Sequence, residues 1–263
     1  MEQLESHIYA VRSWMLSHRL KINDAKTEFM ILCTREQLAK VDVNNLNVGQ
    51  SLIKPVYVLR NLGVTFDPQM SMSDHVNNVC RKGYHQLRKI RQIRKYLSRS
   101  ATEELVHSFV TSNLDYCNAL LFGAPKYVIY KLQKLQNCAA RVICQAKKFD
   151  HATPLLINLH WLPVPQRIEY KIALLTYKCL NNAAPEYLCE LIQLYKPSRQ
   201  LRSSQKQLLN VPICITKTLG PRAFTAAAPQ VWNDLPETIR NALSIKDFKC
   251  KLKTHLFQKA FYS

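Results

Sequence analysis

Residues 84–99 have the sequence YHQLRKIRQIRKYLSR, in which basic and aliphatic side chains recur with a helical period. The cations stand three or four residues apart and so share one stripe of a helix; they are Arg88, Arg91, Lys95 and Arg99. The aliphatic residues fall on the adjacent face and are Leu87, Ile90, Ile93 and Leu97. We therefore predict a helix over about residues 76–98 that packs with one face and presents cations on the next.

Further helices are predicted downstream of this segment. One over residues 102–121 starts at Ser100, followed by Glu103 at the spacing of a capping box. Others are expected over about residues 127–146 and 165–180, and a last one begins at Ser244. The residues expected to face inward on the helix over 127–146 are Leu132, Leu135, Ala139, Val142 and Ala146. Those expected to face inward on the last helix are Ile245, Phe248, Leu252 and Leu256.

The first 75 residues have a different pattern. A helix is predicted near the start, because four apolar residues form one stripe: Leu4, Ile8, Val11 and Met15. Short β-rich runs follow at residues 27–33, 47–53, 56–59 and 62–66, with Gly63 expected to permit a tight turn. The predicted class is α+β: a small antiparallel sheet followed by a mainly helical region. The three tryptophans, Trp14, Trp161 and Trp232, are interpreted as core residues and not as binding residues.

The charge distribution divides the chain near residue 76. The net charge is +19, which indicates a polyanionic partner such as nucleic acid or an anionic membrane. Residues 1–75 hold eight basic and eight acidic side chains, residues 76–149 hold fourteen and three, and residues 150–263 hold fifteen and seven. The excess of positive charge therefore begins with the helical region.

Two further basic patches are candidate phosphate contacts. The second patch comprises Lys131, Lys134, Arg141, Lys147 and Lys148. The third is the loop from Lys196 to Arg222, preceded by Tyr195, which could stack on a base. A basic face that is only solvated, with no partner, is the alternative interpretation.

Several classes of protein and site are disfavoured. No apolar run approaches the roughly 20 residues of a membrane span, and the first residues carry acids instead of a signal-peptide core. We expect no membrane association, no secretion, and a location in the nucleus or cytoplasm. The nine cysteines are scattered without a C-x-x-C pair, so reduced thiols and no metal site are expected.

Two motifs in the first 75 residues resemble those of one known family. Six residues match a "W…LxLNxxKTE" stretch: Trp14, Leu20, Asn23, Lys26, Thr27 and Glu28. Residues 59–67, LRNLGVTFD, are similar to a "YLGVxxD" hairpin and include Leu62, Gly63 and Val64. Both motifs, in this order and spacing, resemble LINE-type, jockey-like non-LTR retrotransposon reverse transcriptases. The resemblance continues through residues 108–117, 159–171 and 220–236 and so covers essentially the whole chain.

The resemblance implies a division of roles along the chain. Residues 1–75 would be a palm remnant with the hairpin that supports the primer end, and Lys26 would lie near the nucleotide triphosphate. Residues 76–150 would be a basic helical thumb that tracks the template–primer duplex. Residues 151–263 would be a C-terminal helical region with a basic loop. The implied partners are RNA and/or DNA, contacted through the nucleic-acid backbone, and no small-molecule substrate is expected.

Polymerase chemistry is not expected from the chain itself. Family members are RNA-directed DNA polymerases that use Mg²⁺, and two-metal nucleotidyl transfer needs converging carboxylates. The sequence contains no Asp-Asp pair, and in the family that pair precedes the position equivalent to Leu4. We therefore assign no catalytic residue and no cofactor to this chain and expect it to be inactive alone. The remaining alternatives are a captured protein-interaction or structural module, and a decayed element without function.

Overall fold

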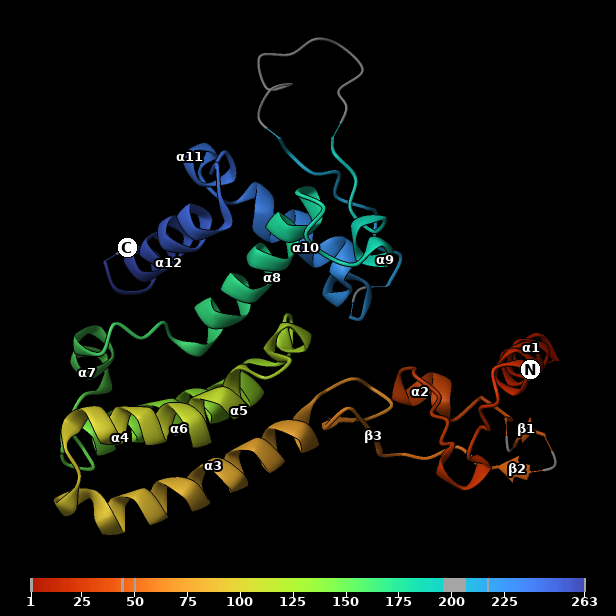
Figure 1. Cartoon of the computed structure of the whole chain (residues 1–263), viewed down its shortest axis with the longest axis horizontal. Helices are drawn as coiled ribbons and strands as arrows, with labels where there is room; N and C mark the ends of the chain where they lie inside the picture. The colour runs from red at the N-terminus through yellow and green to blue at the C-terminus, as the bar shows by residue number, and fades with distance from the viewer. Residues whose placement is uncertain (1, 44, 50, 196–206, 217, 263) are drawn as a thin grey trace. The chain divides into compact units, whose positions relative to one another are not determined.

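The computed structural model describes residues 2–43, 45–49, 51–195, 207–216 and 218–262. The chain divides into two compact units, Met1–His75 and Val76–Ser263, at the position where the charge balance changes. The α+β class is confirmed, because helices dominate and the described strands form two antiparallel two-stranded sheets (Figure 1). Among the described residues, no helix combines the length and the apolar composition that a membrane crossing requires.

The first unit consists of one long helix followed by short elements. In chain order they are α1 (Glu2–Ser17), the 3₁₀ turn η1 (Asp24–Lys26), α2 (Arg35–Leu38), β1 (Leu46–Val48), β2 (Ser51–Ile53), β3 (Leu59–Asn61) and β4 (Val64–Phe66). Strand β1 pairs with β2, and β3 pairs with β4. The predicted strand over residues 27–33 was wrong: Phe29 forms one bridge with Pro55, whose ring nitrogen has no hydrogen to extend a ladder.

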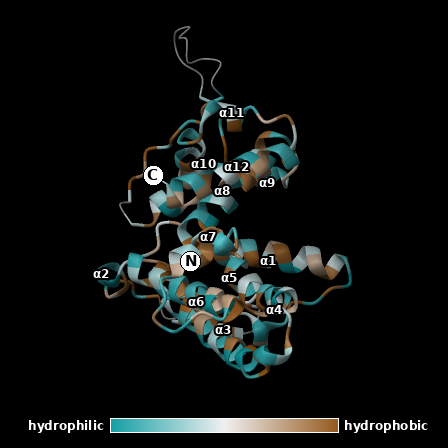
Figure 2. Cartoon of the chain, turned by 90° about the vertical axis from the view of Figure 1, so that its left-hand side faces the viewer, coloured by the Kyte–Doolittle hydropathy of each residue, from teal (hydrophilic) through white to brown (hydrophobic). Residues whose placement is uncertain are grey.

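The helix α1 was predicted correctly, but its apolar stripe is only partly covered, because Ile8 and Met15 are half-buried and the other two residues are exposed. Leu4 and Val11 are 46% and 54% exposed, and hydrophobic residues are interleaved along α1 in Figure 2. Two ribbons of three-residue strands offer α1 little apolar surface to pack against. Glu5 Oε1 accepts from the Asn47 amide at 3.0 Å, and Arg12 forms a 2.9 Å ion pair with Asp24.

The second unit is helical. After α3 (Ser73–Ile93), which begins three residues before the division, its first elements are η2 (Arg94–Tyr96), α4 (Arg99–Val106), the π-helical turn η3 (His107–Thr111), α5 (Ser112–Asp115), η4 (Asn118–Leu121) and α6 (Lys126–Cys144). The later elements are α7 (Ala152–Asn158), α8 (Val164–Leu180), α9 (Glu186–Cys189), η6 (Gly220–Arg222), α10 (Phe224–Asn233), α11 (Glu237–Arg240) and α12 (Ile245–Phe261).

The chain bends between α3 and α4 and breaks again after α5, and each of these two breaks corrects a prediction. Leu97 has extended backbone angles, and the N-cap of α4 is Ser98, whose side chain accepts from the Ala101 amide. Ser98 therefore starts the helix in place of Ser100. The segment predicted as one helix over 102–121 also breaks, because Cys117 adopts φ +51° after α5.

Helices α3 and α6 pack closely at a glycine. A Cβ atom on Gly83 would lie 2.6 Å from the Leu135 side chain, which is fully buried. The inward residues predicted for α6 are confirmed as buried at Leu132, Leu135, Ala139 and Val142, whereas Ala146 follows the helix and is half-buried. This contact fixes the two helices that form the candidate site.

A second core joins α8, α10 and α12. Phe248 is fully buried, and its ring stacks on Tyr177 with centroids 4.2 Å apart and lies 5.9 Å from Trp232. The Tyr177 hydroxyl donates to the Ala242 carbonyl at 3.0 Å. On α12 the predicted inward residues Phe248, Leu252 and Leu256 are buried, while Ile245 is 38% exposed.

Candidate nucleic-acid interface

A groove of about 810 Å³ lies between the C-terminal half of α3 and the C-terminal end of α6. Six cations line this α3–α6 groove: Arg88, Arg91, Arg94, Lys95, Arg141 and Lys148. Tyr84, Leu87 and Cys138 also line it, and no acidic side chain lines it among the described residues. The structure thus brings together cations that are more than 40 residues apart in the sequence.

Four of the groove cations are exposed. Arg88 and Arg91 project from α3, Lys95 from η2, and Lys148 from the loop after α6. Within the described ranges, no acidic side chain forms an ion pair with any of the four. Their charges are therefore available to an external anion.

Arg94 has a structural role at the groove. Its Nε and Nη2 donate to the carbonyls of Val142 and Ile143 at 3.1 and 3.0 Å, and its Nη1 donates to the Leu97 carbonyl at 2.8 Å. A cation at the C-terminus of α6 satisfies carbonyls that the helix leaves free and complements the helix dipole. Arg94 therefore joins η2 to the end of α6.

Arg141 fixes the other wall. Its Nε and Nη2 donate to the Asp150 carbonyl at 3.0 and 2.8 Å, and an Asp150 carboxylate oxygen accepts from the Lys147 amide at 2.7 Å. These bonds close the loop that carries Lys147 and Lys148. Arg141 thus contributes charge to the groove and also positions Lys148.

The structure separates the predicted basic residues into two sets. Arg88, Arg91, Lys95, Arg141 and Lys148 line the groove. The predicted single stripe was wrong at its end, because Arg99 lies on α4 and bonds to Glu103 at 2.9 Å.

Three predicted lysines lie outside the groove lining. Lys131 Nζ donates to Asn77 Oδ1 at 2.8 Å, and Lys134 Nζ lies 4.5 Å from the centroid of the Tyr130 ring. Both are exposed on α6, and Lys147 is exposed in the loop after it. They extend the basic surface without lining the groove.

Sequence reasoning missed Arg94 as a site residue. It lies seven residues after Leu87, so on the predicted helix it falls on the apolar face and not on the basic stripe. That position could have indicated a structural role, because an arginine on a packing face needs hydrogen-bond acceptors that are themselves buried. Its acceptors are the carbonyls at the end of α6.

Aromatic side chains lie beside the groove cations. Lys95 Nζ is 4.7 Å from the Tyr96 ring centroid, and Lys148 Nζ is 5.3 Å from that of Phe149. Within the groove, burial raises the pKa of Tyr84 to about 12, with further increases from Cys138 and Cys80. The Tyr84 hydroxyl therefore stays neutral at physiological pH.

The residues of the first family motif lie around η1 of the first unit. Asn23 is the N-cap of η1, and Thr27 Oγ1 donates to the Asn23 carbonyl at 3.1 Å. Lys26 and Glu28 are exposed. Trp14 is 60% exposed and lies 4.3 Å from the His18 ring, so its interpretation as a core residue was wrong.

The second motif forms the β3–β4 hairpin. Leu62 and Gly63 make a two-residue turn with φ of +46° and +85°, the signs that suit the twist of a tight hairpin. Val64 is buried and Leu62 is 83% exposed. The Asp67 carboxylate accepts from the amides of Ser71 and Met72, both at 2.9 Å, and so serves the loop before α3.

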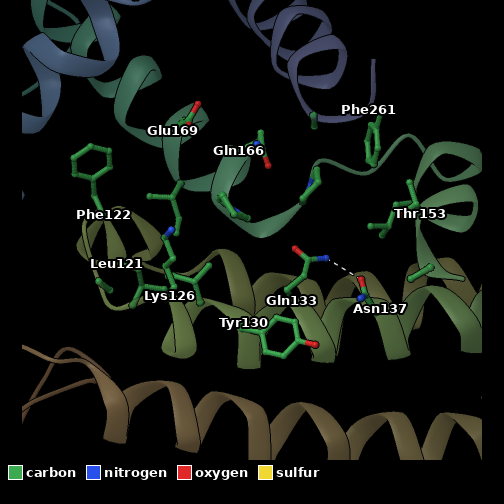
Figure 3. A pocket seen from close by; sticks show the side chains of 18 of the residues that line it. Leu121, Phe122, Lys126, Tyr130, Gln133, Asn137, Thr153, Gln166, Glu169 and Phe261 are labelled. Atoms are coloured by element: carbon green, nitrogen blue, oxygen red, sulfur yellow. Dashed lines mark hydrogen bonds between the residues drawn. The ribbon is translucent and has the colours of Figure 1, made fainter. Parts of the chain in front are cut away.

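A separate pocket of about 730 Å³ lies between α6, α8 and the end of α12 (Figure 3). Its lining is largely apolar, and Gln133 and Asn137 are hydrogen bonded to each other at 2.8 Å on α6. Gln133 Oε1 also accepts from the Val164 amide. Nothing in the lining matches the cation cluster of the groove.

The third predicted patch lies mostly outside the described residues, which exclude Lys196, Arg199, Arg202, Lys206 and Lys217. Of its described members, Arg222 Nε donates to the Phe122 carbonyl at 3.1 Å, and Tyr195 is 46% exposed.

In the described part of the chain, no three His, Cys, Asp or Glu residues form a group that could hold a metal ion. Comparisons of the chain with models of protein families, with curated proteins and with solved structures find no match.

Proposed function

We propose that the chain is part of a LINE-type retrotransposon reverse transcriptase. We also propose that its second unit binds the phosphate backbone of RNA or DNA through the α3–α6 groove. The observation that carries the binding proposal is the set of six cations in a groove whose described lining contains no acidic side chain. The motifs around Asn23–Glu28 and Leu62–Val64 support the family proposal by resemblance alone.

Backbone binding is the form of recognition that this groove supports. Arginine and lysine neutralise phosphates and release condensed counterions, so affinity is steeply dependent on salt and tolerant of sequence. Reading a base edge needs acceptors and donors set at fixed positions. Four of the groove cations are exposed, while Arg94 and Arg141 are held by backbone carbonyls.

We expect no primer extension by the chain alone, with Mg²⁺ and all four nucleotides present. The sequence contains no Asp-Asp pair to hold the two metal ions that nucleotidyl transfer requires. A primer-extension assay checks this, with an active reverse transcriptase as positive control. Extension that scales with the amount of purified protein would overturn the expectation.

The binding proposal is tested by removing exposed groove charges. The double variant Arg88→Ala/Arg91→Ala is expected to bind a short oligonucleotide about tenfold more weakly, at roughly 0.7 kcal/mol per phosphate contact. Fluorescence anisotropy at fixed salt measures the affinity. Lys246→Ala/Lys249→Ala is the matched control, because it removes two exposed charges from α12. Equal losses in both variants, or no binding by the wild type, would contradict the proposal, and the latter result is what a protein-interaction module predicts.

A further inference from the structure

We propose that the α3–α6 groove takes a single-stranded polynucleotide, with Tyr96 and Phe149 stacking on its bases while the neighbouring lysines hold its phosphates. This inference rests on the proposed function and narrows it to one class of ligand.

Among the aromatic side chains of the described residues, these two rings have the largest exposed fractions. Phe149 is 87% exposed and Tyr96 is 77% exposed. Burying an aromatic ring lowers the free energy. A ring that stays exposed to water beside a charged groove therefore has apolar surface available to a ligand.

Each ring is paired with a groove cation. Lys148 Nζ lies over the Phe149 ring and Lys95 Nζ over the Tyr96 ring, at 5.3 and 4.7 Å from the centroids. Both lysines line the groove. A nucleotide carries one base and one phosphate, so a ring beside a cation matches the chemistry of one nucleotide.

The two ring–cation pairs come from different segments that the fold holds together. Tyr96 lies on η2, and Phe149 lies in the loop between α6 and α7. The C-terminal ends of α3 and α6 lie at the same end of this unit (Figure 1). Arg94 bonds η2 to the last carbonyls of α6, and Arg141 bonds to the carbonyl of Asp150 next to Phe149. The rings are therefore presented on an ordered part of the groove rim.

Base stacking distinguishes a single strand from a duplex. In a duplex the base faces are covered by neighbouring bases, so an exposed side chain reaches only phosphates and groove edges. In a single strand each base can be displaced onto an aromatic ring, and every base has such a face. Exposed rings beside the phosphate-binding cations therefore favour a single strand.

The test compares ligands that share phosphates but differ in bases. The variant Tyr96→Ala/Phe149→Ala is expected to bind oligothymidylate and oligouridylate about tenfold or more weakly, because stacking contributes substantially for each base. Its affinity for an abasic strand of the same length, and for a duplex, is expected to stay within about twofold. The control Tyr187→Ala removes a ring on α9 that is 67% exposed and should change none of the affinities.

The outcomes separate this inference from the proposed function. A base-dependent loss on either the DNA or the RNA strand supports it. An equal loss on the abasic strand, or no loss on any strand, overturns it. If Arg88→Ala/Arg91→Ala still weakens binding in that case, the groove remains the interface. If neither double variant changes binding, both proposals fail.

Discussion

Replacing Arg94 with alanine is expected to lower the free energy of unfolding by about 3 kcal/mol and to weaken polynucleotide binding with it. The Arg94 guanidinium donates to three carbonyls, on Val142, Ile143 and Leu97. Hydrogen bonds from a charged donor contribute roughly 1.5–3 kcal/mol each, and water recovers part of this at a half-buried site. Loss of these bonds frees η2 from α6, so Lys95 and Tyr96 lose their position at the groove.

Two variants serve as controls for Arg94. Arg94→Lys should recover less than half of the lost stability, since an ammonium group cannot reproduce a planar fork that meets several acceptors. Arg88→Ala should change the free energy of unfolding by less than about 0.5 kcal/mol, because its side chain is exposed. Urea unfolding followed by circular dichroism measures all three. Equal stability of Arg94→Ala and Arg88→Ala would refute the structural role.

Replacing Phe248 with alanine is expected to cost about 4 kcal/mol of folding free energy. Phe248 is fully buried between Tyr177 and Trp232, and its removal leaves a cavity that this stacked cluster cannot close. Phe248→Leu should cost less, about 1–2 kcal/mol, because it fills part of the volume.

The neighbouring residue Leu243 is the control for this core, since it is 98% exposed. Leu243→Ala should change the stability by less than about 0.5 kcal/mol. Thermal unfolding followed by circular dichroism checks both variants. A Phe248→Ala protein as stable as Leu243→Ala would contradict the packing of α8, α10 and α12.

The helices that the sequence predicted best are those that pack along their whole length. On α6 and α12 the apolar period coincides with burial at residues such as Leu132, Leu135, Phe248 and Leu252. On α1 the apolar period predicted the helix but not the exposure of its apolar face, because a helical pattern specifies a face but not whether another element covers it. It also failed at Leu97, where the capping of α4 by Ser98 ends the helical run.

The candidate site was predictable in composition but not in arrangement. The basic character of residues 76–149 and five of the groove residues follow from the sequence. The meeting of Arg94 with the end of α6, 48 residues away, depends on the close approach at Gly83 and Leu135. The periodicity of a single segment cannot predict a contact between residues so far apart in the sequence. The pairing of Lys148 with Phe149 likewise points to a binding role only because the fold places Lys148 in the groove.

The salt dependence of binding tests the groove most directly. If the four exposed groove cations each meet a phosphate, the logarithm of the association constant for oligothymidylate should fall with the logarithm of salt concentration with a slope of about −3, at roughly 0.7 per contact. Arg88→Ala/Arg91→Ala should reduce the slope to about −1.5, while Lys246→Ala/Lys249→Ala should leave it near −3. A slope that is the same in the groove variant and in the wild type would contradict the assignment of binding to the α3–α6 groove.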